Sequence, residues 1–559
     1  MAEGESLPDG EKELTLEIKN PALIATLAIL VLLLVAELQV TFGTPIAFGD
    51  EGYYTRMAQW IGENLEYPKW IMFRSTALTK RAYTRPPLWD MLQASFVMIF
   101  GFSEALVKFF TPFIALLAGL ASFLLIRRLY NERIGLMAAV MLAMIPSFII
   151  YAVTFYTDAL ETLYLTMFFF LFIIGLKEDK MKYLLAAVCI AALAYFTKKT
   201  GFISLIFILF GFVYEMRKAK QPFWQLFKKY AVLIGIPLLL SSSLIVRTFA
   251  LYGVPCDVPM FELPVFKFMY PSEYGCDEVS FKEQYQYSGR VAETGTEKGV
   301  LDLGLLSYLD FAYGNVWLVI FGACAGAFVF IARRDDVDVL MLAALLLYVL
   351  ILYRSTGRSE DTARFALPWA PIICLLAASY FDEMYKFIRS YQRHIAVVLF
   401  VIVIFASYQN FSSKIGVMAE VKEFYPSFFV ACDWIKSNTQ KDALVSTLWV
   451  YRASYCTQRS VAASSADLTQ SNDVDHILNV TKQLGITYIW VNKFSIDPLN
   501  RHYSEMYDLS YVQLLESHPE YFEKVYETGS PMSECTQTVC DGNIIYKITW
   551  DAQVVEQPS

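Results

Sequence analysis

Residues 21–43 read PALIATLAILVLLLVAELQVTFG, and this apolar stretch points to the fold class of the whole chain. An apolar run of roughly 17–25 residues is long enough to cross about 30 Å of hydrocarbon as a helix. The composition agrees, because 56% of the 559 residues are hydrophobic, 18% are charged and the mean hydropathy is +0.42. Soluble domains are about 45–50% apolar and about 25% charged. The sequence therefore predicts a membrane protein.

Runs of the same kind recur from this stretch up to residue 410. One such run alone is also typical of a buried helix in a soluble protein, but a soluble core does not need so many. The sequence predicts about eleven spans and hence an α-helical polytopic membrane protein. The spans are expected at residues 21–43, 105–126, 134–156, 159–176, 182–197, 201–216, 230–250, 313–332, 337–353, 365–383 and 394–410.

Five short loops between these spans are rich in Lys and Arg, and all five fall on the same side of the membrane. The positive-inside rule assigns that side to the cytoplasm. The N-terminus is then cytoplasmic, the chain after residue 410 is extracellular, and the expected location is the plasma membrane. The basic residues are Arg127, Arg128 and Arg133, then Lys177, Lys180 and Lys182, then Arg217, Lys218, Lys220, Lys228 and Lys229, then Arg333 and Arg334, and last Lys386, Arg389 and Arg393.

The cysteines fit this orientation. Three of the nine lie in predicted spans, and the other six lie in predicted external segments, where disulfides form readily. Proximity in the sequence favours the pairs Cys256–Cys276 and Cys535–Cys540, while reduced thiols remain the alternative.

We expect three parts: a cytoplasmic tail at 1–20, a membrane domain at 21–410 and an extracytoplasmic domain at 411–559. The membrane domain carries long external loops at 44–104 and 251–305, and loops of that length are usually functional. Within the first loop, Leu88 to Phe102 is apolar but too short to span, which predicts a re-entrant or interfacial helix. After residue 420, strand-like and helix-like segments alternate, which predicts a small α/β fold.

No nucleotide-binding, zinc-binding or nucleic-acid-binding signature occurs in the chain. Chemistry is therefore expected from polar side chains at the external ends of the spans, because such residues are costly near a membrane and usually functional. The first cluster follows the first span: Asp50, Glu51, Tyr53, Tyr54 and Arg56. A carboxylate at this position suits a general base, and a helix N-cap is the structural alternative for Asp50.

Four more clusters fall on the same external side. Arg85 precedes a Pro-Pro-Leu segment, Thr157-Asp158 lies at a turn between spans, and Lys198-Lys199 lies outside against the positive-inside bias. The last cluster includes Arg358 and Arg364. Arg and Lys side chains suit phosphate binding, since guanidinium groups bind phosphate oxygens in pairs.

These clusters, in this order, resemble the GT-C superfamily of glycosyltransferases that use polyprenyl- or dolichyl-phosphate sugars. The nearest branch contains the protein O-mannosyltransferases and the aminoarabinose transferases, and the external tail looks like that of archaeal members. The matching segments are Asp50-Glu51, Arg85-Pro86-Pro87-Leu88, Thr157-Asp158, Thr197-Lys198-Lys199 and Arg364-Phe365-Ala366-Leu367-Pro368. Either Lys198 or Lys199 corresponds to the lysine of the family motif.

The resemblance implies an inverting transfer of a mannose-like hexose from the lipid-phosphate donor to an acceptor hydroxyl on the external face. It implies catalytic roles for Asp50, Glu51 and Asp158, a substrate loop with Tyr53, Tyr54 and Arg56, and donor-phosphate contacts from Arg85, Lys198, Lys199, Arg358 and Arg364. The sequence requires no cofactor and predicts no metal ligands, and it leaves a divalent cation open. The acceptor is a glycan, a protein or a lipid, and nucleic acid is not a partner.

Two other classes compete with this interpretation. A polytopic lipid or sugar transporter, such as a flippase, also has many spans, but it would place charges at mid-span and interrupt helices in two matching halves. A non-catalytic membrane scaffold with an external recognition domain is the second alternative. Release of polyprenyl phosphate from a labelled donor separates an enzyme from both.

Overall fold

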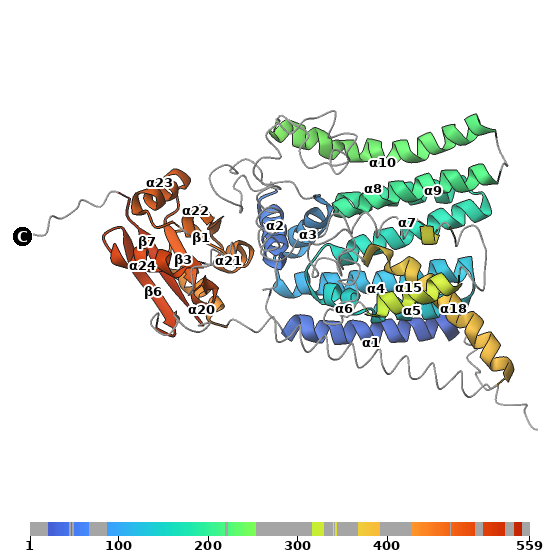
Figure 1. Ribbon diagram of the computed structural model, residues 1–559, viewed down its shortest axis with the longest axis horizontal. Helices are drawn as coiled ribbons and strands as arrows, with labels where there is room; N and C mark the ends of the chain where they lie inside the picture. Colours follow the sequence, from blue (N-terminus) through green and yellow to red (C-terminus); the bar gives the residue numbers. More distant parts are fainter. Residues whose placement is uncertain are drawn as a thin grey trace, which may run out of the picture.

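The structure is a computed structural model with a bundle of long helices and an α/β part at one end of it (Figure 1). It describes residues 21–43, 46, 50–65, 86–218, 222–252, 316–328, 339, 341–343, 367–391, 426–464, 466–469, 471–497, 507–531 and 541–550.

The long helices of the bundle run side by side (Figure 1). Among the described residues, five helices are long and apolar enough to cross a membrane, or up to six if one bent pair counts as a span. The bundle helices are α1 (Pro21–Gly43), α4 (Glu104–Leu129), α5 (Glu132–Met144), α6 (Pro146–Val153), α7 (Asp158–Glu178), α8 (Met181–Thr197), α9 (Ile203–Arg217), α10 (Phe223–Tyr252), α15 (Val316–Ala327) and α18 (Ala370–Tyr391).

Most of the predicted spans correspond to these helices. The prediction at 134–156 is the exception in shape, because α5 and α6 meet at Pro146 with a bend of 66°. Proline has no N–H to donate into the preceding turn, so a helix readily restarts there. The predicted spans at 337–353 and 394–410 lie mostly or wholly outside the described residues, and the count of about eleven stays a prediction.

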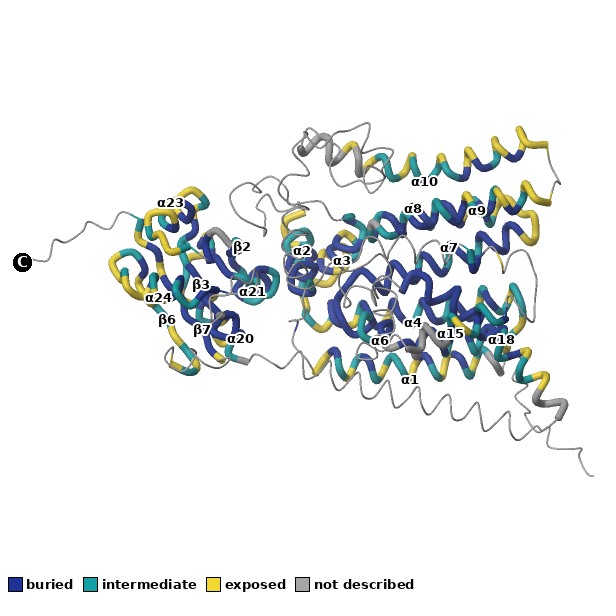
Figure 2. Tube along the Cα trace, in the orientation of Figure 1, coloured by how far each residue is buried: buried dark blue, intermediate teal, exposed yellow. Residues whose placement is uncertain are grey.

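Burial identifies the centre of the bundle. The apolar window of α7 is 83% buried, whereas that of α1 is 17% buried. Figure 2 shows the same contrast, with α7 dark blue along most of its length and α1 and α10 largely exposed. Exposed side chains on α1 and α10, such as Leu32 and Leu239, are apolar, as expected of surfaces that face lipid. The chain is therefore a membrane protein built around α7.

Two short helices lie at the end of the bundle next to the α/β part (Figure 1). They are α2 (Glu51–Asn64) and α3 (Leu88–Phe100). The position of α3 matches the predicted re-entrant or interfacial helix, and its C-terminal residues Met98, Ile99 and Phe100 are exposed and apolar. An apolar surface on a short helix at the end of a membrane bundle is typical of contact with the membrane interface.

The α/β part has a five-stranded sheet in the order β2-β1-β3-β7-β6. The first three strands in this order are parallel, and β7 pairs antiparallel with both β3 and β6. The strands are β1 (Leu444–Thr447), β2 (Ser460–Ala463), β3 (Tyr488–Asn492), β6 (Phe522–Gly529) and β7 (Gly542–Ile548), with a two-stranded sheet of β4 (Ile496–Asp497) and β5 (Tyr507–Asp508). The helices are α20 (Pro426–Asn438), α21 (Val450–Thr457), α22 (Ala466–Thr469), α23 (Val474–Leu484) and α24 (Leu509–Ser517).

The sheet is apolar along its central strand β3, and a paired charge follows the end of that strand. Ile489, Trp490 and Val491 of β3 are fully buried, which explains why this strand reads as a continuous apolar run. Lys493 follows β3, and its fully buried ammonium lies 2.8 Å from a Glu527 carboxylate oxygen. Lys524 lies 3.0 Å from the other oxygen of Glu527.

Candidate active site

The Asp50-Glu51 pair lies at the start of α2, at the end of the bundle next to the α/β part. Asp50 occupies the N-cap position, but its side chain makes no cap hydrogen bond to α2. Its backbone N–H donates to the Tyr156 hydroxyl at 2.9 Å. Asp50 therefore stands at the N-cap position that the sequence offered as its structural alternative, but without the side-chain hydrogen bond that such a residue usually makes.

Glu51 is buried, with 1% of its surface exposed. One of its carboxylate oxygens accepts a hydrogen bond from the Phe155 N–H at 2.9 Å. Phe155 belongs to the turn between α6 and α7, which also contains Thr157 and leads directly into Asp158. This contact brings together the first and the third of the clusters that the sequence singles out.

Asp158 is the first residue of α7, and it forms a buried ion pair. The Lys198 ammonium lies 2.6 Å from an Asp158 oxygen and 3.3 Å from an oxygen of Glu161, one turn further along α7. The Thr200 hydroxyl donates to the other oxygen of Glu161. The third and fourth clusters thus meet as well, and Glu161 joins them.

Two carboxylates share the single Lys198 ammonium in this group, and both carboxylates are 1% exposed. A donor phosphate that reaches Lys198 would meet an ammonium that already has two partners. Lys199 starts the short 3-10 helix η1 (Lys199–Phe202). That turn packs tightly on α8, since a Cβ at Gly201 would lie 2.5 Å from the Ala194 carbonyl carbon. Phosphate binding by Lys198 or Lys199 stays a prediction.

The remaining predicted phosphate ligands, Arg85, Arg358 and Arg364, lie outside the described residues. Arg56 is described, and its side chain is engaged elsewhere. Its guanidinium donates to Gln458, the residue that follows α21, at 2.6 Å and to Gln59 at 3.2 Å. Burial lowers the pKa of Arg56. This arginine therefore binds the α/β part to α2.

Aromatic rings fill the space between α2, α3 and the α6–α7 turn. The Tyr54 ring lies edge-on to Tyr156 and Trp89, with centroids 6.3 and 6.4 Å away. Trp89 is fully buried and lies 5.5 Å from Phe155. On the other side, Tyr53 lies 5.7 Å from Tyr451 of α21. Edge-to-face contacts of this kind add stability beyond the area they bury, so the loop that carries Asp50 and Glu51 is firmly packed.

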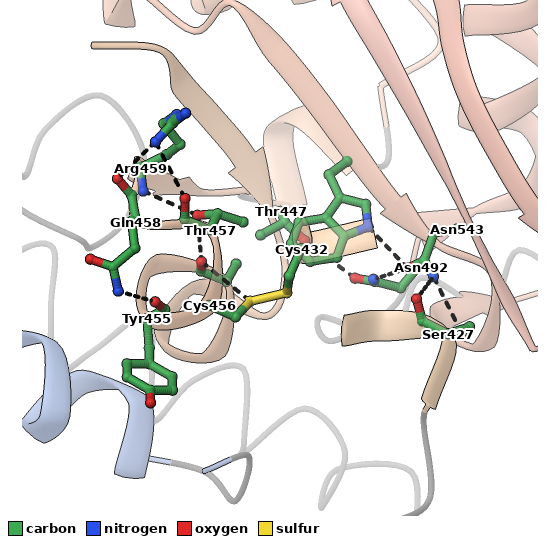
Figure 3. The surroundings of a disulfide bond; sticks show 12 residues. Ser427, Cys432, Thr447, Tyr455, Cys456, Thr457, Gln458, Arg459, Asn492 and Asn543 are labelled. Carbon is green, nitrogen blue, oxygen red and sulfur yellow. Dashed lines mark hydrogen bonds between the residues drawn. A yellow bond between two sulfur atoms is a disulfide. The ribbon is translucent and has the colours of Figure 1, made fainter. Parts of the chain in front are cut away.

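The α/β part contacts this loop through α21. A Cβ at Gly52 would lie 2.4 Å from the Tyr451 carbonyl oxygen, so only glycine permits the approach of α21 to α2. The Tyr455 hydroxyl donates to Glu104 at the start of α4 at 2.9 Å. A disulfide joins Cys456 of α21 to Cys432 of α20 (Figure 3). In Figure 3 the Tyr455 ring points away from this disulfide, toward the helical part drawn in blue.

The disulfide settles one pairing that the sequence left open. The favoured pairs, Cys256–Cys276 and Cys535–Cys540, lie outside the described residues and stay predictions. Cys432 and Cys456 are 24 residues apart in the sequence, and their bond fixes α21 against α20.

Sequence reasoning missed three charged residues near the site: Glu104, Lys108 and Glu161. All three lie in or at the edge of apolar runs, where an isolated charged residue does not by itself indicate a site. Their helical spacing was a usable signal, because Glu104 and Lys108 are four residues apart, and Asp158 and Glu161 are three apart, so each pair shares a helix face. Within the described residues, no group of three or more His, Cys, Asp or Glu side chains is suited to hold a metal ion.

Comparison with known proteins gives one family model. The model for dolichyl-phosphate-mannose-protein mannosyltransferases matches residues 84–246, which include Asp158 and Lys198. No curated protein matches the chain at a significant level.

Several solved structures share the fold. The crystal structure of the Archaeoglobus fulgidus oligosaccharyltransferase in its apo form has a TM-score of 0.61 and 14% identity, and it covers 96% of this chain and 76% of that one. The A. fulgidus AglB complex with an inhibitory peptide and a dolichol-phosphate has a TM-score of 0.59, 14% identity and coverage of 96% and 75%. ArnT from Cupriavidus metallidurans bound to undecaprenyl phosphate has a TM-score of 0.54, 13% identity and coverage of 94% and 98%.

Proposed function

We propose, on the premise that this chain belongs to the GT-C superfamily of membrane glycosyltransferases, that it transfers a hexose from a polyprenyl- or dolichyl-phosphate donor to an acceptor hydroxyl. The reaction takes place outside the cytoplasm, at the end of the bundle where α2, α3 and the α/β part lie. The donor sugar is mannose-like, and the acceptor is a glycan, a protein or a lipid. Support for the donor class comes from relatives of the same fold that were solved with dolichol-phosphate or undecaprenyl phosphate.

One observation carries this proposal: two groups of charged residues, far apart in the sequence, meet at one end of the bundle. The Glu51 carboxylate accepts a hydrogen bond from the Phe155 N–H. Asp158, three residues after Phe155, forms an ion pair with Lys198. Buried charges are expensive, and a chain that gathers several of them at the membrane surface usually uses them.

The orientation rests on the opposite end of the bundle. Basic residues gather there, and Arg128 of α4 contacts Glu178 at the end of α7 through two hydrogen bonds of 3.1 Å. Lys229 of α10 contacts Glu215 of α9 at 2.8 Å. The positive-inside rule makes that end cytoplasmic and leaves the candidate site outside.

In the proposed mechanism the Asp50 carboxylate takes the proton of the acceptor hydroxyl as that oxygen attacks the anomeric carbon of the sugar. The bond between this carbon and the phosphate oxygen breaks, the polyprenyl phosphate leaves with the electron pair, and the anomeric configuration inverts. Charge develops on the leaving phosphate, which is stabilised by cations rather than by an acid. Lys198, Lys199, Arg85, Arg358 and Arg364 are the candidates for that role. Glu51 and Asp158 support the loop that carries Asp50.

The experiment is the Asp50→Asn substitution, which keeps the size of the side chain and removes its ability to take a proton. We expect turnover to fall by about 10²–10⁴-fold, the usual contribution of a general base, while donor binding is retained. The measurement is the initial rate of polyprenyl phosphate release at saturating labelled donor, with and without a chelator, because the need for a divalent cation is open.

Glu51→Gln is the matched control, and its loss should be smaller because this side chain holds the turn at Phe155. Near-normal turnover in Asp50→Asn would remove Asp50 as the base. Donor binding without any release of polyprenyl phosphate by the wild-type protein would favour a transporter instead.

A further inference from the structure

A small pocket lies beside Glu51, at the junction of α1, α4 and the α6–α7 turn. The space in it that the centre of a water-sized sphere can occupy is about 10 Å³, and it is lined by Thr41, Ile46, Glu51, Lys108, Thr111, Val153, Thr154 and Phe155. The lining contains one acidic side chain, one basic side chain and three hydroxyls. A polar pocket of this size has room for about one water molecule, which needs two to four polar partners.

Lys108 is the basic side chain of this pocket. It lies on α4, and 9% of its surface is exposed. Its ammonium lies 2.7 Å from a Glu104 oxygen, one helical turn closer to the α/β part. An ion pair at this spacing is a common way to stabilise a helix, and that is the simplest interpretation of the contact. Lys108 also shares the pocket with a second acidic residue, Glu51. A pair that only stabilised the helix would not require this second carboxylate.

Glu51 lines the same pocket as Lys108. Its carboxylate is buried, and one oxygen is held by the Phe155 N–H. Burial of a carboxylate is costly unless it is hydrogen-bonded and has a cation nearby. Lys108 supplies the only ammonium among the residues that line the pocket. In the described part of the chain, the buried Thr111 hydroxyl of the same pocket has no hydrogen-bond partner, which leaves it available to a bridging water.

The contact continues into the α/β part. The second oxygen of Glu104 accepts a hydrogen bond from the Tyr455 hydroxyl of α21 at 2.9 Å. Burial, together with the charges of Glu104 and Glu51, raises the pKa of Tyr455, so its hydroxyl keeps its proton and remains a donor. A continuous series of polar contacts therefore runs from α21 through Glu104 to Lys108, and on to the pocket that holds Glu51.

We infer that Lys108 is a positioning residue of the proposed transfer reaction: it acts across the shared pocket to hold the Glu51 carboxylate in place, and the Tyr455–Glu104 contact lets the α/β part hold Lys108. The inference rests on the proposed function for its effect on turnover, but the inferred interaction between Lys108 and Glu51 across the pocket does not depend on it. Lys108 touches neither donor nor acceptor in this scheme. It acts through Glu51 on the loop that begins with Asp50.

The test is a double-mutant cycle with Lys108→Met and Glu51→Gln, since such a cycle isolates the interaction between two residues. We expect Lys108→Met to lower kcat by up to about 10²-fold, the size that follows a misplacement of about 1 Å, with the donor KM unchanged. In the Glu51→Gln background, Lys108→Met should have little further effect. Lys108→Arg should restore part of kcat, because it keeps the charge. Tyr455→Phe should lower kcat less than Lys108→Met.

A readout without turnover separates this inference from the proposed function. The midpoint of thermal unfolding is measured for the same four proteins of the cycle in detergent. We expect Lys108→Met to lower the midpoint in the wild-type background more than in the Glu51→Gln background. Equal shifts in both backgrounds would overturn the inference, even if the protein is an active transferase. Non-additive shifts in a protein that transfers no sugar would support the Lys108–Glu51 contact and contradict the proposed function alone.

Discussion

Gly52→Ala should disable the site while leaving the fold intact. The added Cβ would lie 2.4 Å from the Tyr451 carbonyl oxygen and 2.7 Å from its carbon, whereas ordinary contacts begin at 3.4 Å. Both atoms are backbone, so they do not rotate away. To relieve this clash, α2 and α21 must move apart by roughly 1 Å, the difference between 2.4 and 3.4 Å. Overpacking of this kind costs about 1–3 kcal/mol.

The expected effect on activity follows from the place of Gly52, two residues after Asp50. A misplacement of about 1 Å in a catalytic group costs up to about 10²-fold in rate. Ala is favoured over Gly in a helix by about 1 kcal/mol, so helix propensity alone would make this substitution stabilising. A loss of turnover therefore reports the contact between α2 and α21.

The assay compares the initial rate of polyprenyl phosphate release with the midpoint of thermal unfolding. Gly235→Ala in α10 is the control, because a Cβ there meets nothing within 4 Å. We expect the control to behave as wild type and Gly52→Ala to lose turnover with little change in donor binding. Unchanged turnover in Gly52→Ala would refute the idea that α21 fixes the position of the catalytic loop.

Three further predictions concern stability. Lys198→Met should destabilise the protein by about 3–5 kcal/mol, and Asp158→Asn by less, because Glu161 then still pairs with the lysine; denaturant unfolding checks the order of the two. Cys456→Ser should cost about 3 kcal/mol, and a reductant should lower the unfolding midpoint of the wild type by more than that of the variant. Burial raises the pKa of Glu527, but hydrogen bonds from two lysines outweigh this and hold it below its ordinary value. The ionised Glu527 carboxylate then stabilises the fold fully above its unfolded pKa of about 4.3, and this stabilisation is lost as the pH falls through its lower pKa in the folded state. Acidification below about pH 4 should therefore lower the unfolding midpoint of the wild type more than that of Glu527→Gln.

Local patterns in the sequence predicted a large part of the helical architecture. The length of the apolar runs located α1, α4, α7 and α10, and the shortness of the run after Leu88 located α3. The positions of the prolines are less reliable indicators of where helices end. Pro112 and Pro237 lie inside continuous helices, whereas Pro146 separates α5 from α6. Whether a proline breaks a helix depends on neighbours that can satisfy the freed carbonyl groups, and a single sequence does not reveal them.

The candidate site was also predictable only in part from the sequence. The basic loops indicate the side of the membrane, and that side was enough to group Asp50, Glu51, Asp158 and Lys198 from the sequence alone. Their partners were not predictable, because the Arg56–Gln458 contact joins residues 402 positions apart and neither residue type marks a site. Lys108 was hidden for another reason. A single lysine at the end of an apolar helix is typically interpreted as a residue that extends its charge to the interface, and only the pocket shows that Lys108 and Glu51 line the same space.

The contact between α2 and α21 also sets an order of events during biosynthesis. A ribosome makes chains from the N-terminus, so α2 and the carboxylates at its start are complete long before α21, about 400 positions later. The partner surface of α21 is held by a disulfide, which forms only after that segment reaches an oxidising compartment. In the proposed orientation, α21 docks on α2 only after the α/β part has been exported, so the loop that carries Asp50 takes its final position late in biosynthesis.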